Sequence, residues 1–539
     1  MIKTISRLRF EYENLNTLTY DIIAECEFSK GEIYDFHIPV KKEEDLVLRQ
    51  KYLLARLHNI LTVSSPKCVT LYVPEEIIDE ILSYRQILLN TSKSYSIIPE
   101  IIERMYQTRL KIDVFTHQDI KKRRTLVKVT NNKHKIFNSV KEKANGIIMG
   151  VDFGGTDLKI VILQNSEIIF SIEHVWNPPP KQYDNPKSYQ ENILQLIYFS
   201  LAVVSLKQED GLYEMKEAAR MLVEDENSSL AEKDKFTYRV KNAEIIFKKP
   251  LYVGLSFPDI ILNNMIVGGM TSKYTALREK FTSENGVLKE DYWEQFNKFI
   301  RPMPLNIAKS LKKRFSEKIP VHIINDGNAG ALWGFSESNS HGILAFSLGT
   351  SLAGGGGIKR KPLEGIFEIG NMIILPEANE KQDRIHRNLD LYGTAQQLLS
   401  QDTVFHLAEK KGLINEFPQI DEANVLKQIQ KMVEKNNYDA IDIFQKMGEN
   451  LVFVLDSLLL AIPDTEFDQL ILFGRVVRGK SGDILMKKAR DILQKDPLFK
   501  RISKIKICRA SELHDDKNRK NNSFKYNVFA QALGAIVNI

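Results

Sequence analysis

The most constraining feature of this sequence is a short acidic and glycine-rich stretch, Gly-Val-Asp-Phe-Gly-Gly-Thr-Asp-Leu-Lys at residues 150–159. Apolar runs at residues 147–149 and 160–163 flank it, which predicts a β-hairpin. The polar and glycine residues at its tip are Asp152, Gly154, Gly155 and Thr156. Glycines let backbone amides approach phosphate, a threonine hydroxyl adds a donor, and a carboxylate can hold hydrated magnesium. An ordinary hairpin with a glycine turn has the same local pattern, so the rest of the chain must decide.

Composition places the chain among soluble globular proteins. Its 539 residues are enough for roughly two to four domains with large cores, and 43% of them are hydrophobic and 27% charged. The net charge of +6, from 75 basic and 69 acidic residues, does not indicate a nucleic-acid partner. The three cysteines, Cys26, Cys68 and Cys508, are far apart, which excludes a disulfide framework and is typical of a reducing compartment.

No segment of the sequence is typical of secretion or membrane insertion. Residues 1–7 lack the apolar core of a signal peptide, and no apolar run approaches the roughly 18 residues of a membrane span. We therefore expect a cytoplasmic protein with no membrane partner.

Residues 1–117 are expected to form an additional N-terminal α/β domain without a catalytic role. Its strand and helix patterns have the order βββαβαβ, which resembles the ribonuclease H-like fold. The segments are strands at Ile5–Tyr12, Leu18–Phe28 and Glu32–Val40, a helix at Leu46–Leu61, a strand at 69–73, a helix at 74–89 and a strand at 111–115. The acids Glu11, Glu13 and Asp21 could be imagined as a metal cluster, but solvated strand residues are the simpler interpretation.

Residues 118–145 are rich in lysine and arginine. Such a run could bind nucleic acid, but it contains no aromatic platform beyond Phe137, and a solvated basic linker is the simpler interpretation. After the hairpin, residues 187–205 have a helical pattern, and the charged, mainly helical residues 208–249 are interpreted as an insertion.

Two later strands are predicted to place acids at their carboxyl ends, where open α/β sheets bind ligands. Residues 251–256 end in Phe-Pro, which leaves Asp259 at the tip, although a buried turn acid explains it equally well. Residues 321–325 deliver Asn325 and Asp326 before a run of small residues. A carboxylate there can accept the proton of an attacking hydroxyl while the amide orients the substrate. A helix N-cap is the alternative for Asp326.

The third and fourth motifs are strands that end in glycine. The apolar run 343–348 is followed by Gly349, Thr350 and Ser351, whose amides and hydroxyls could bind phosphate, or which could form a structural hairpin. The run 470–473 is followed by Gly474 and a helical pattern at 484–493, so that the backbone could pack against a base or ribose.

Taken in order, the four motifs resemble those of sugar kinases in the actin, hexokinase and Hsp70 superfamily, and they look most like those of the ROK family of sugar kinases and repressors. The resemblance covers residues 146–539, with hexokinase-like features at 154–159 and 255–258. It implies an α/β fold of two ribonuclease H-like (actin-like ATPase) domains around a cleft. Their expected extents are 146–335 and 336–539, with the last helix returning to the first domain.

The resemblance also implies roles for individual residues. It makes Asp326 the general base and places Asp152 near magnesium, through water. Residues 367–372 look like the ROK segment Gly-Glu-x-Gly-His. The implied sugar-binding residues are Asn325, Glu368, Asn371, Asp390 and Asp259. The implied ATP-binding residues are Gly154, Gly155, Thr156, Lys159, Gly349, Thr350, Ser351 and Gly474.

The sequence departs from the ROK pattern at the sugar side. Asn371 stands where the family has histidine, Asp390 stands where it has glutamate, and no cysteine lies between Met372 and Leu391. Because a structural zinc needs about four nitrogen or sulfur ligands, we expect no such zinc. These departures leave the identity of the sugar open, but they leave phosphoryl transfer chemically feasible.

We therefore expect ATP- and Mg²⁺-dependent phosphorylation of a hexose or N-acetylhexosamine hydroxyl, in a site that closes and excludes water. The alternatives are a non-catalytic sugar sensor, as in ROK repressors, and a regulatory scaffold. Those repressors carry an N-terminal winged helix-turn-helix, whereas this chain opens with strand patterns, so we expect no nucleic-acid partner. The resemblance also implies a homodimer.

Overall fold

The computed structural model of the chain describes residues 3–14, 19–28, 31–42, 45–89, 97–119, 146–155, 157–225, 227–268, 274–283, 288–363, 365–379, 385–386, 389–416, 422–462, 466–513 and 526–537. The chain is divided into two compact units. Unit 1 comprises residues 1–135, 340–359 and 363–513, and unit 2 comprises residues 136–339, 360–362 and 514–539. Across the described ranges, none of the helices has the length and apolar character that crossing a membrane requires. The basic linker falls outside the described residues except for its first two positions.

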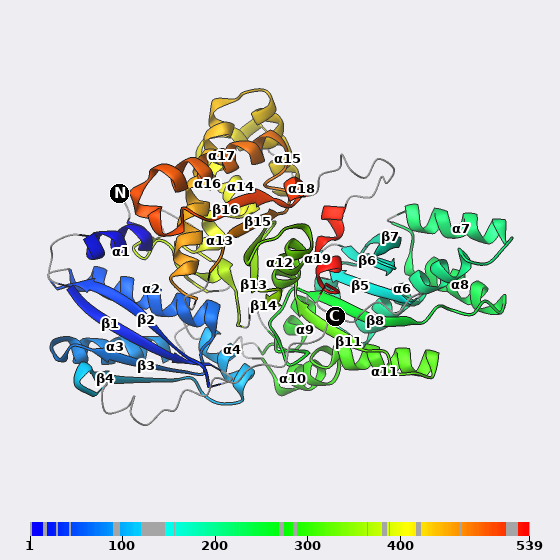
Figure 1. The fold of residues 1–539 in the computed structure, drawn as a ribbon, viewed down its shortest axis with the longest axis horizontal. Helices are drawn as coiled ribbons and strands as arrows, with labels where there is room; N and C mark the ends of the chain where they lie inside the picture. Colours follow the sequence, from blue (N-terminus) through cyan, green and yellow to red (C-terminus); the bar gives the residue numbers. More distant parts are fainter. Residues whose placement is uncertain are drawn as a thin grey trace. The chain divides into compact units, whose positions relative to one another are not determined.

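The N-terminal part of unit 1 contains a four-stranded sheet in the order β2-β1-β3-β4 (Figure 1). Strand β1 is antiparallel to β2 and β3, and β3 is parallel to β4. The strands are β1 (Thr19–Glu27), β2 (Ile33–Lys41), β3 (Cys68–Val73) and β4 (Lys111–Thr116). The helices are α1 (Ile5–Asn14), α2 (Leu46–Ser64), α3 (Ile78–Leu89) and α4 (Ile97–Tyr106). The strand predictions at β1 to β4 and the helix predictions at α2 and α3 are confirmed.

The prediction of a strand at Ile5–Tyr12 is wrong, because these residues form helix α1. Ile5, Leu8 and Tyr12 are all buried, and their spacing of three and four residues is that of one helix face. The order βββαβαβ is therefore wrong as well, and α4 was not predicted. Glu11 and Glu13 lie on α1 in ion pairs with Lys3 and Arg9, at 2.5 and 2.7 Å.

Unit 2 contains a five-stranded sheet in the order β11-β8-β5-β6-β7. Its strands are β5 (Ile147–Phe153), β6 (Asp157–Gln164), β7 (Glu167–Val175), β8 (Pro250–Phe257) and β11 (Val321–Asn325). Strands β5 and β6 form the predicted antiparallel hairpin, in which Asp152 lies opposite Lys159. Strand β8 is parallel to both β5 and β11, so the carboxyl ends of β5, β8 and β11 meet at one edge of the sheet.

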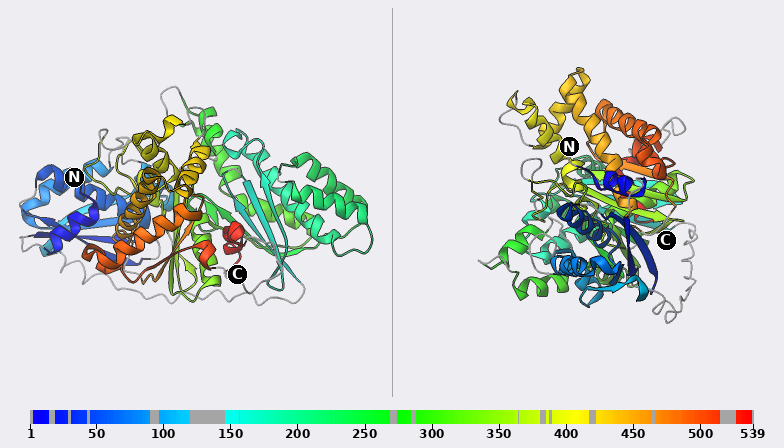
Figure 2. Two further views of the ribbon diagram at one scale, coloured as in Figure 1. Left: turned by 90° about the horizontal axis from the view of Figure 1, so that it is seen from above. Right: turned by 90° about the vertical axis from the view of Figure 1, so that its left-hand side faces the viewer.

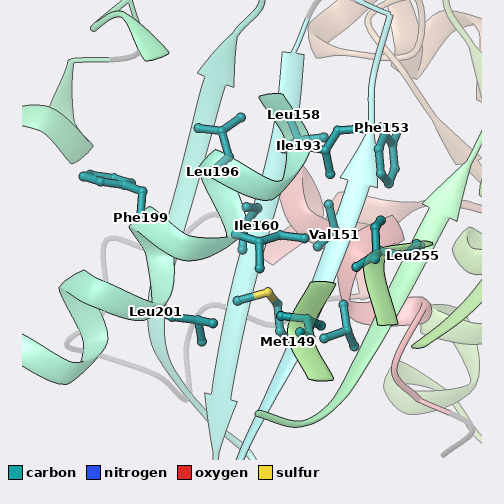
Figure 3. Packing of buried hydrophobic residues seen from close by; sticks show 14 of the residues in the cluster. Met149, Val151, Phe153, Leu158, Ile160, Ile193, Leu196, Phe199, Leu201 and Leu255 are labelled. Atoms are coloured by element: carbon teal, nitrogen blue, oxygen red, sulfur yellow. The ribbon is translucent and has the colours of Figure 1, made fainter. Parts of the chain in front are cut away.

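Helix α6 (Pro186–Leu206) confirms the predicted helix at 187–205 and covers the core of unit 2. Figure 3 shows Ile193 and Leu196 of α6 against the strand residues Met149, Val151 and Ile160, all of them fully buried. Fully burying one such aliphatic side chain contributes about 1.5–3 kcal/mol. This packing fixes α6 against the strands that form the first hairpin.

The residues interpreted as an insertion form α7 (Tyr213–Glu224) and α8 (Leu230–Asn242). Helix α8 packs along α6 (Figure 2), where Phe236 meets Phe199 edge to face at 5.7 Å between ring centroids. Its start is fixed by a capping box, in which the Ser229 hydroxyl accepts from Glu232 N and the Glu232 carboxylate accepts from Ser229 N. Further elements of unit 2 are β9 (Ile261–Leu262), β10 (Met265–Ile266), α9 (Thr275–Lys280), α10 (Glu290–Gln295), α11 (Met303–Phe315), α12 (Asp326–Glu337) and α19 (Ala530–Gly534).

The second sheet of unit 1 repeats the strand order of unit 2. Its strands β12 (Gly342–Leu348), β13 (Leu352–Ile358), β15 (Gln469–Phe473) and β16 (Lys506–Arg509) lie in the order β13-β12-β15-β16. Strands β12 and β13 are an antiparallel hairpin, and β12, β15 and β16 are parallel. Four strands of unit 2, β6-β5-β8-β11, have the same arrangement. The longest helices of this part are α14 (Gln401–Lys410), α15 (Glu422–Glu434), α16 (Tyr438–Leu459) and α17 (Gly479–Lys495).

Candidate active site

The carboxyl edge of the unit 2 sheet brings together acids from separate parts of the sequence. Asp152, near the end of β5, lies in register with Ser256 of β8. The side chain of Asp152 is only 4% exposed, and its Oδ1 accepts a hydrogen bond of 2.7 Å from the Ser256 hydroxyl. A buried carboxylate requires such donors. Ser256 was not predicted as a site residue. Its position at a strand end, directly before Phe-Pro-Asp, could have indicated that it lies near the predicted site.

Asp259 connects the ends of β8 and β11. It is buried, and its Oδ1 accepts from the amide of Ile260 at 2.7 Å. Its backbone carbonyl accepts a hydrogen bond of 3.2 Å from Asn325 Nδ2. Asp259 thus supports Asn325 through its backbone carbonyl, and its contact with a sugar stays a prediction.

The cap of helix α12 is Asn325 and not Asp326. Asn325 Oδ1 accepts from the amides of Gly327 and Asn328 at 2.9 and 3.2 Å. Asp326 is the first helical residue, half-buried, and its Oδ1 accepts from the amide of Gly327 at 2.8 Å. The N-terminus of a helix favours negative charge, so a carboxylate is well placed at this position.

The tip of the first hairpin is built for close approach of the backbone. A Cβ on Gly154 would collide with the carboxylate of Asp157, whereas a Cβ on the exposed Gly155 would meet nothing within 4 Å. The space beside Gly155 is therefore open to a ligand. Thr156, the predicted hydroxyl donor, lies outside the described residues.

Lys159 lies among acids of its own sheet. It pairs with Asp157 and, at 3.5 Å, with Glu173. Burial lowers the pKa of Lys159, but the charges of Asp152, Asp157 and Glu173 outweigh burial and raise this pKa above its ordinary value. Lys159 therefore stays protonated and offsets the buried charge of Asp152. Direct contact of Lys159 with a phosphate remains a prediction.

No group of three or more histidine, cysteine, aspartate or glutamate side chains that could hold a metal occurs in the described ranges. A magnesium ion that contacts one carboxylate through its own water does not need such a group.

In unit 1, the third predicted motif is the tight turn between β12 and β13. The amide of Gly349 donates to Ser351 O at 3.1 Å, and Thr350 and Ser351 are exposed. Gln396 fixes this turn, since its Nε2 donates to Thr350 O at 3.1 Å and its Oε1 accepts from Leu352 N at 2.6 Å. Gln396 was not predicted, because it is distant in sequence and no motif surrounds it.

The fourth motif lies directly beside the third. Gly474 has a φ of +101°, and a Cβ on it would collide with the carbonyl oxygen of Leu348, the last residue of β12. Glycine is therefore required at this position for two reasons, which are the positive φ and the close approach of the neighbouring strand.

Gly474→Ala is expected to destabilise the protein by roughly 3 kcal/mol or more, because it combines backbone strain with a collision. Gly412→Ala is the matched control, since Gly412 also has a positive φ, +72°, but its nearest neighbour is a side-chain atom at 3.8 Å. We expect that variant to lose only about 1 kcal/mol. Urea unfolding of both variants measures the difference, and equal losses would contradict the importance of the contact with Leu348.

The segment predicted to bind sugar also lies in unit 1. Glu368, half-buried, precedes the short 3₁₀ turn Ile369–Asn371. A Cβ on Gly370 would lie 2.8 Å from Leu352 O, so this turn packs against the start of β13, next to the turn at residues 349–351. The structure thus brings residues 368–371 and 349–352 together.

Asn371 carries a buried side-chain donor that no described residue satisfies. It is 4% exposed, and within the described part of the chain its Nδ2 is buried without a hydrogen-bond partner. Such donors are normally satisfied. Asp390, in contrast, is exposed with a φ of +47°. Its turn leads into Gly393, whose carbonyl accepts from Ile374 N at 2.8 Å.

Helix α2 and the residue that follows it hold this segment from the other side. His58 Nε2 lies 3.0 Å from Asn371 O. Asn59 makes two hydrogen bonds to the backbone of Ile373. Its Nδ2 donates to Ile373 O at 2.8 Å, and its Oδ1 accepts from Ile373 N at 2.7 Å. Ser65 Oγ accepts from Ile366 N at 2.6 Å. Sequence reasoning gave α2 no role, because these contacts join residues about 300 positions apart.

No protein-family model matches the sequence, and neither does any curated protein. The chain is similar to solved structures of ROK proteins. One is a ROK family glucokinase from Streptomyces griseus in complex with glucose and AMPPNP, at 14% identity and TM-score 0.41, covering 72% of this chain and 98% of that one. Another is a putative N-acetylmannosamine kinase from Listeria monocytogenes, at 16% identity and TM-score 0.41, covering 73% and 98%. A third is a ROK family transcriptional regulator, a homologue of the E. coli MLC protein, at 11% identity and TM-score 0.44, covering 73% and 78%. Because these TM-scores are below 0.5, the function proposed below is drawn from the residues of this chain.

His58, which supports the ROK-like segment, makes stability depend on pH. Burial lowers the pKa of His58 to about 4, the hydrogen bond to Asn371 O raises it less, and His386 lowers it further. Because the folded pKa lies below the ordinary value of about 6.5, this contribution to stability is complete above pH 6.5 and is lost as the pH falls toward 4. We expect a loss of about 3 kcal/mol over this range from His58 alone.

Urea unfolding at pH 7 and at pH 4.5 tests this expectation. His58→Gln should flatten the pH dependence, because glutamine has no titratable group in this range. An unchanged slope in His58→Gln would show that His58 is not the group responsible.

Proposed function

We propose that this protein is an ATP-dependent kinase that phosphorylates a hydroxyl of a hexose or N-acetylhexosamine, with two ribonuclease H-like domains of the ROK type. The observation that carries the proposal is the carboxyl edge of the unit 2 sheet. There Asp152, Asn325 and Asp326 lie at the ends of parallel strands, in the pattern expected for nucleotide and hydroxyl chemistry.

Asp326 acts as the general base in this proposal. Its carboxylate accepts the proton of the sugar hydroxyl as the oxygen attacks the γ-phosphate of ATP. The Asn325 cap holds the start of α12, and Asp259 O holds the Asn325 amide at 3.2 Å. This support fixes the direction of Asp326, and a fixed base needs no reorganisation during the reaction.

The phosphates of ATP bind at two glycine turns. The amides near Gly154 and Gly155 and those of the turn at Gly349 to Ser351 are the donors, and the close packing of Gly474 on Leu348 offers a flat backbone surface for the nucleoside. A buried carboxylate beside an open glycine tip is a suitable acceptor for a hydrated magnesium ion, which would neutralise phosphate charge near Asp152.

The sugar hydroxyls bind to residues of the segment that α2 supports. Glu368 accepts hydrogen bonds from hydroxyls, and the buried Nδ2 of Asn371 donates one. Asp390 contributes from its exposed turn. Asparagine in place of the family histidine changes the donor that a sugar meets, so we expect a sugar preference that differs from that of ROK glucokinases.

The test is ATP consumption by the purified protein with glucose, mannose, fructose, N-acetylglucosamine and N-acetylmannosamine in turn. Turnover with one sugar, lost in Asp326→Asn, is the expected result. Calorimetric titration with each sugar is the parallel measurement. If the protein binds a sugar but consumes no ATP with any sugar of the panel, the proposal of a kinase is overturned and a non-catalytic sugar sensor is favoured.

A further inference from the structure

A groove on unit 2 lies outside the candidate active site. It runs between α8 and α11, with one wall residue from α6, and encloses about 920 Å³. The side chains that matter here are Tyr198, Tyr238, Arg239, Phe247, Lys313 and Arg314. Its volume falls within the range of roughly 300–1,000 Å³ that is typical of small-molecule sites.

The groove is at the opposite edge of the sheet from the acids. Phe247 precedes β8 by three residues, and α11 ends shortly before β11 begins, so the groove adjoins the amino ends of these strands. Ser256 and Asn325 mark the carboxyl ends. An eight-residue strand such as β8 spans about 25 Å, which separates the groove from the phosphoryl-transfer site.

The groove has an excess of positive charge. Five cations line it, from Lys235, Arg239, Lys241, Lys313 and Arg314, against the single acid Asp234. Among the residues that the structure describes, none of these five cations forms an ion pair with a carboxylate. Nearby on α7, by contrast, Arg220 pairs with Glu217 and Glu224, at 2.5 and 2.6 Å. An excess of cations around a concave surface attracts and concentrates anions.

Aromatic rings complete the groove. Phe247 is buried at its floor, and the Arg314 guanidinium carbon lies 4.4 Å from the centroid of this ring. Tyr238 is 63% exposed at the rim, so one face of a large ring is available next to Arg239 and Lys241. Flat rings of ligands stack on such side chains, and arginine binds phosphate through two parallel hydrogen bonds.

We propose that this groove binds a small, multiply charged anion that carries a flat ring, with a nucleoside di- or triphosphate as its chemical class. The ring stacks on Tyr238, and the phosphates lie between the cations of α8 and α11. A groove of about 920 Å³ that combines cations with aromatic rings fits such a ligand better than it fits an extended acidic peptide. Because α8 belongs to the inserted residues 208–249, the site is an addition to the phosphoryl-transfer machinery and does not depend on the proposed kinase function.

Equilibrium dialysis with radiolabelled ADP at 0.15 M NaCl tests the proposal on the full chain. The groove variant is Arg239→Ala combined with Lys313→Ala. The matched control is Lys309→Ala combined with Lys312→Ala, which removes two exposed lysines of α11 that do not line the groove. We expect the groove variant to bind one equivalent of ADP fewer than wild type, or to bind it at least tenfold more weakly, while the control matches wild type.

Two further measurements keep the result interpretable. Tyr238→Ala should weaken the same equivalent, and Tyr238→Phe should keep it, because phenylalanine preserves the stacking face. Inorganic tripolyphosphate should compete more weakly than ADP, since it lacks the ring. Equal ADP binding by wild type, groove variant and control would overturn the proposal. If the kinase function fails but the groove is real, the groove variant still binds one equivalent of ADP fewer than wild type, so the two failures are distinguishable.

Discussion

Replacing Asp326 by asparagine is expected to lower kcat for sugar phosphorylation by about 10²–10⁴-fold, which is the usual contribution of a general base. Asparagine has nearly the same shape but cannot accept the proton of the attacking hydroxyl. Binding of the sugar should change little, because the base acts mainly in the transition state.

The structure explains why this variant should remain folded. Asparagine keeps a side-chain oxygen that can accept from the amide of Gly327, which lies 2.8 Å from Asp326 Oδ1. Asn325, and not Asp326, caps the helix, and Gln531 Nε2 donates to the backbone carbonyl of Asp326 at 3.3 Å, which the substitution does not affect. Any loss of activity should therefore come from chemistry.

Glu337→Gln, at the other end of α12, is the control for this experiment. It makes the same change from carboxylate to amide in the same helix, and it should leave kcat and KM unaltered. Steady-state kinetics, calorimetric titration with the sugar and thermal unfolding complete the comparison. Turnover of Asp326→Asn within a few-fold of wild type would rule out Asp326 as the base.

Replacing Asn59 by alanine is expected to destabilise the protein by roughly 2–4 kcal/mol. Asn59 is buried, and it satisfies both the amide and the carbonyl of Ile373, at 2.7 and 2.8 Å. Alanine leaves both of these groups without a partner, and each unsatisfied buried group costs about 1–3 kcal/mol.

The same variant should also weaken sugar binding if residues 366–373 form the sugar site. Asn59 holds this segment from α2 through both of its hydrogen bonds to Ile373, so its loss should loosen Glu368 and Asn371. We expect KM for the sugar to rise about tenfold, equivalent to about 1.4 kcal/mol, with a smaller change in kcat.

Asn437→Ala separates positioning from general instability. Asn437 caps α16 in the same unit by accepting from Ala440 N at 3.0 Å, and its loss should cost about 1 kcal/mol. It touches no residue of the sugar segment in the described structure, so KM should stay unchanged. A rise in KM of the same size in both variants would show that Asn59 acts only through stability.

Local patterns accounted for most of the strands and for both glycine hairpins. The runs 147–149 and 160–163, the Asn325–Asp326 strand end and the turn at Gly349 were all predicted at their observed places. Each of these features is encoded within about ten consecutive residues, as an apolar strand followed by turn residues. At α1 the same reasoning failed. The apolar residues of this short segment fit both the period of a strand and that of a helix, and only the packing shows which face is buried.

The partners of the site residues could not be predicted. Ser256 on Asp152, Gln396 on Thr350 and Asn59 on Ile373 are separated in sequence by 104, 46 and 314 positions. Lys159 was predicted on the basis of its motif alone, and its ion pair with Glu173 depends on the register of β6 against β7. These contacts join residues that are distant in sequence, so the local sequence around neither partner predicts them.

The sequence by itself determined which residues stand at strand ends and turns, since backbone preference and hydrophobic periodicity are local properties of the chain. It also placed Asn371 at the position where the resemblance to ROK proteins leads one to expect histidine. Only the tertiary structure decided that helix α2 supports the segment carrying Glu368 and Asn371, that Gly474 packs on Leu348, and that helix α8 forms a basic groove with α11. These are contacts between distant segments, and they exist only once burial of the apolar faces has brought the segments together.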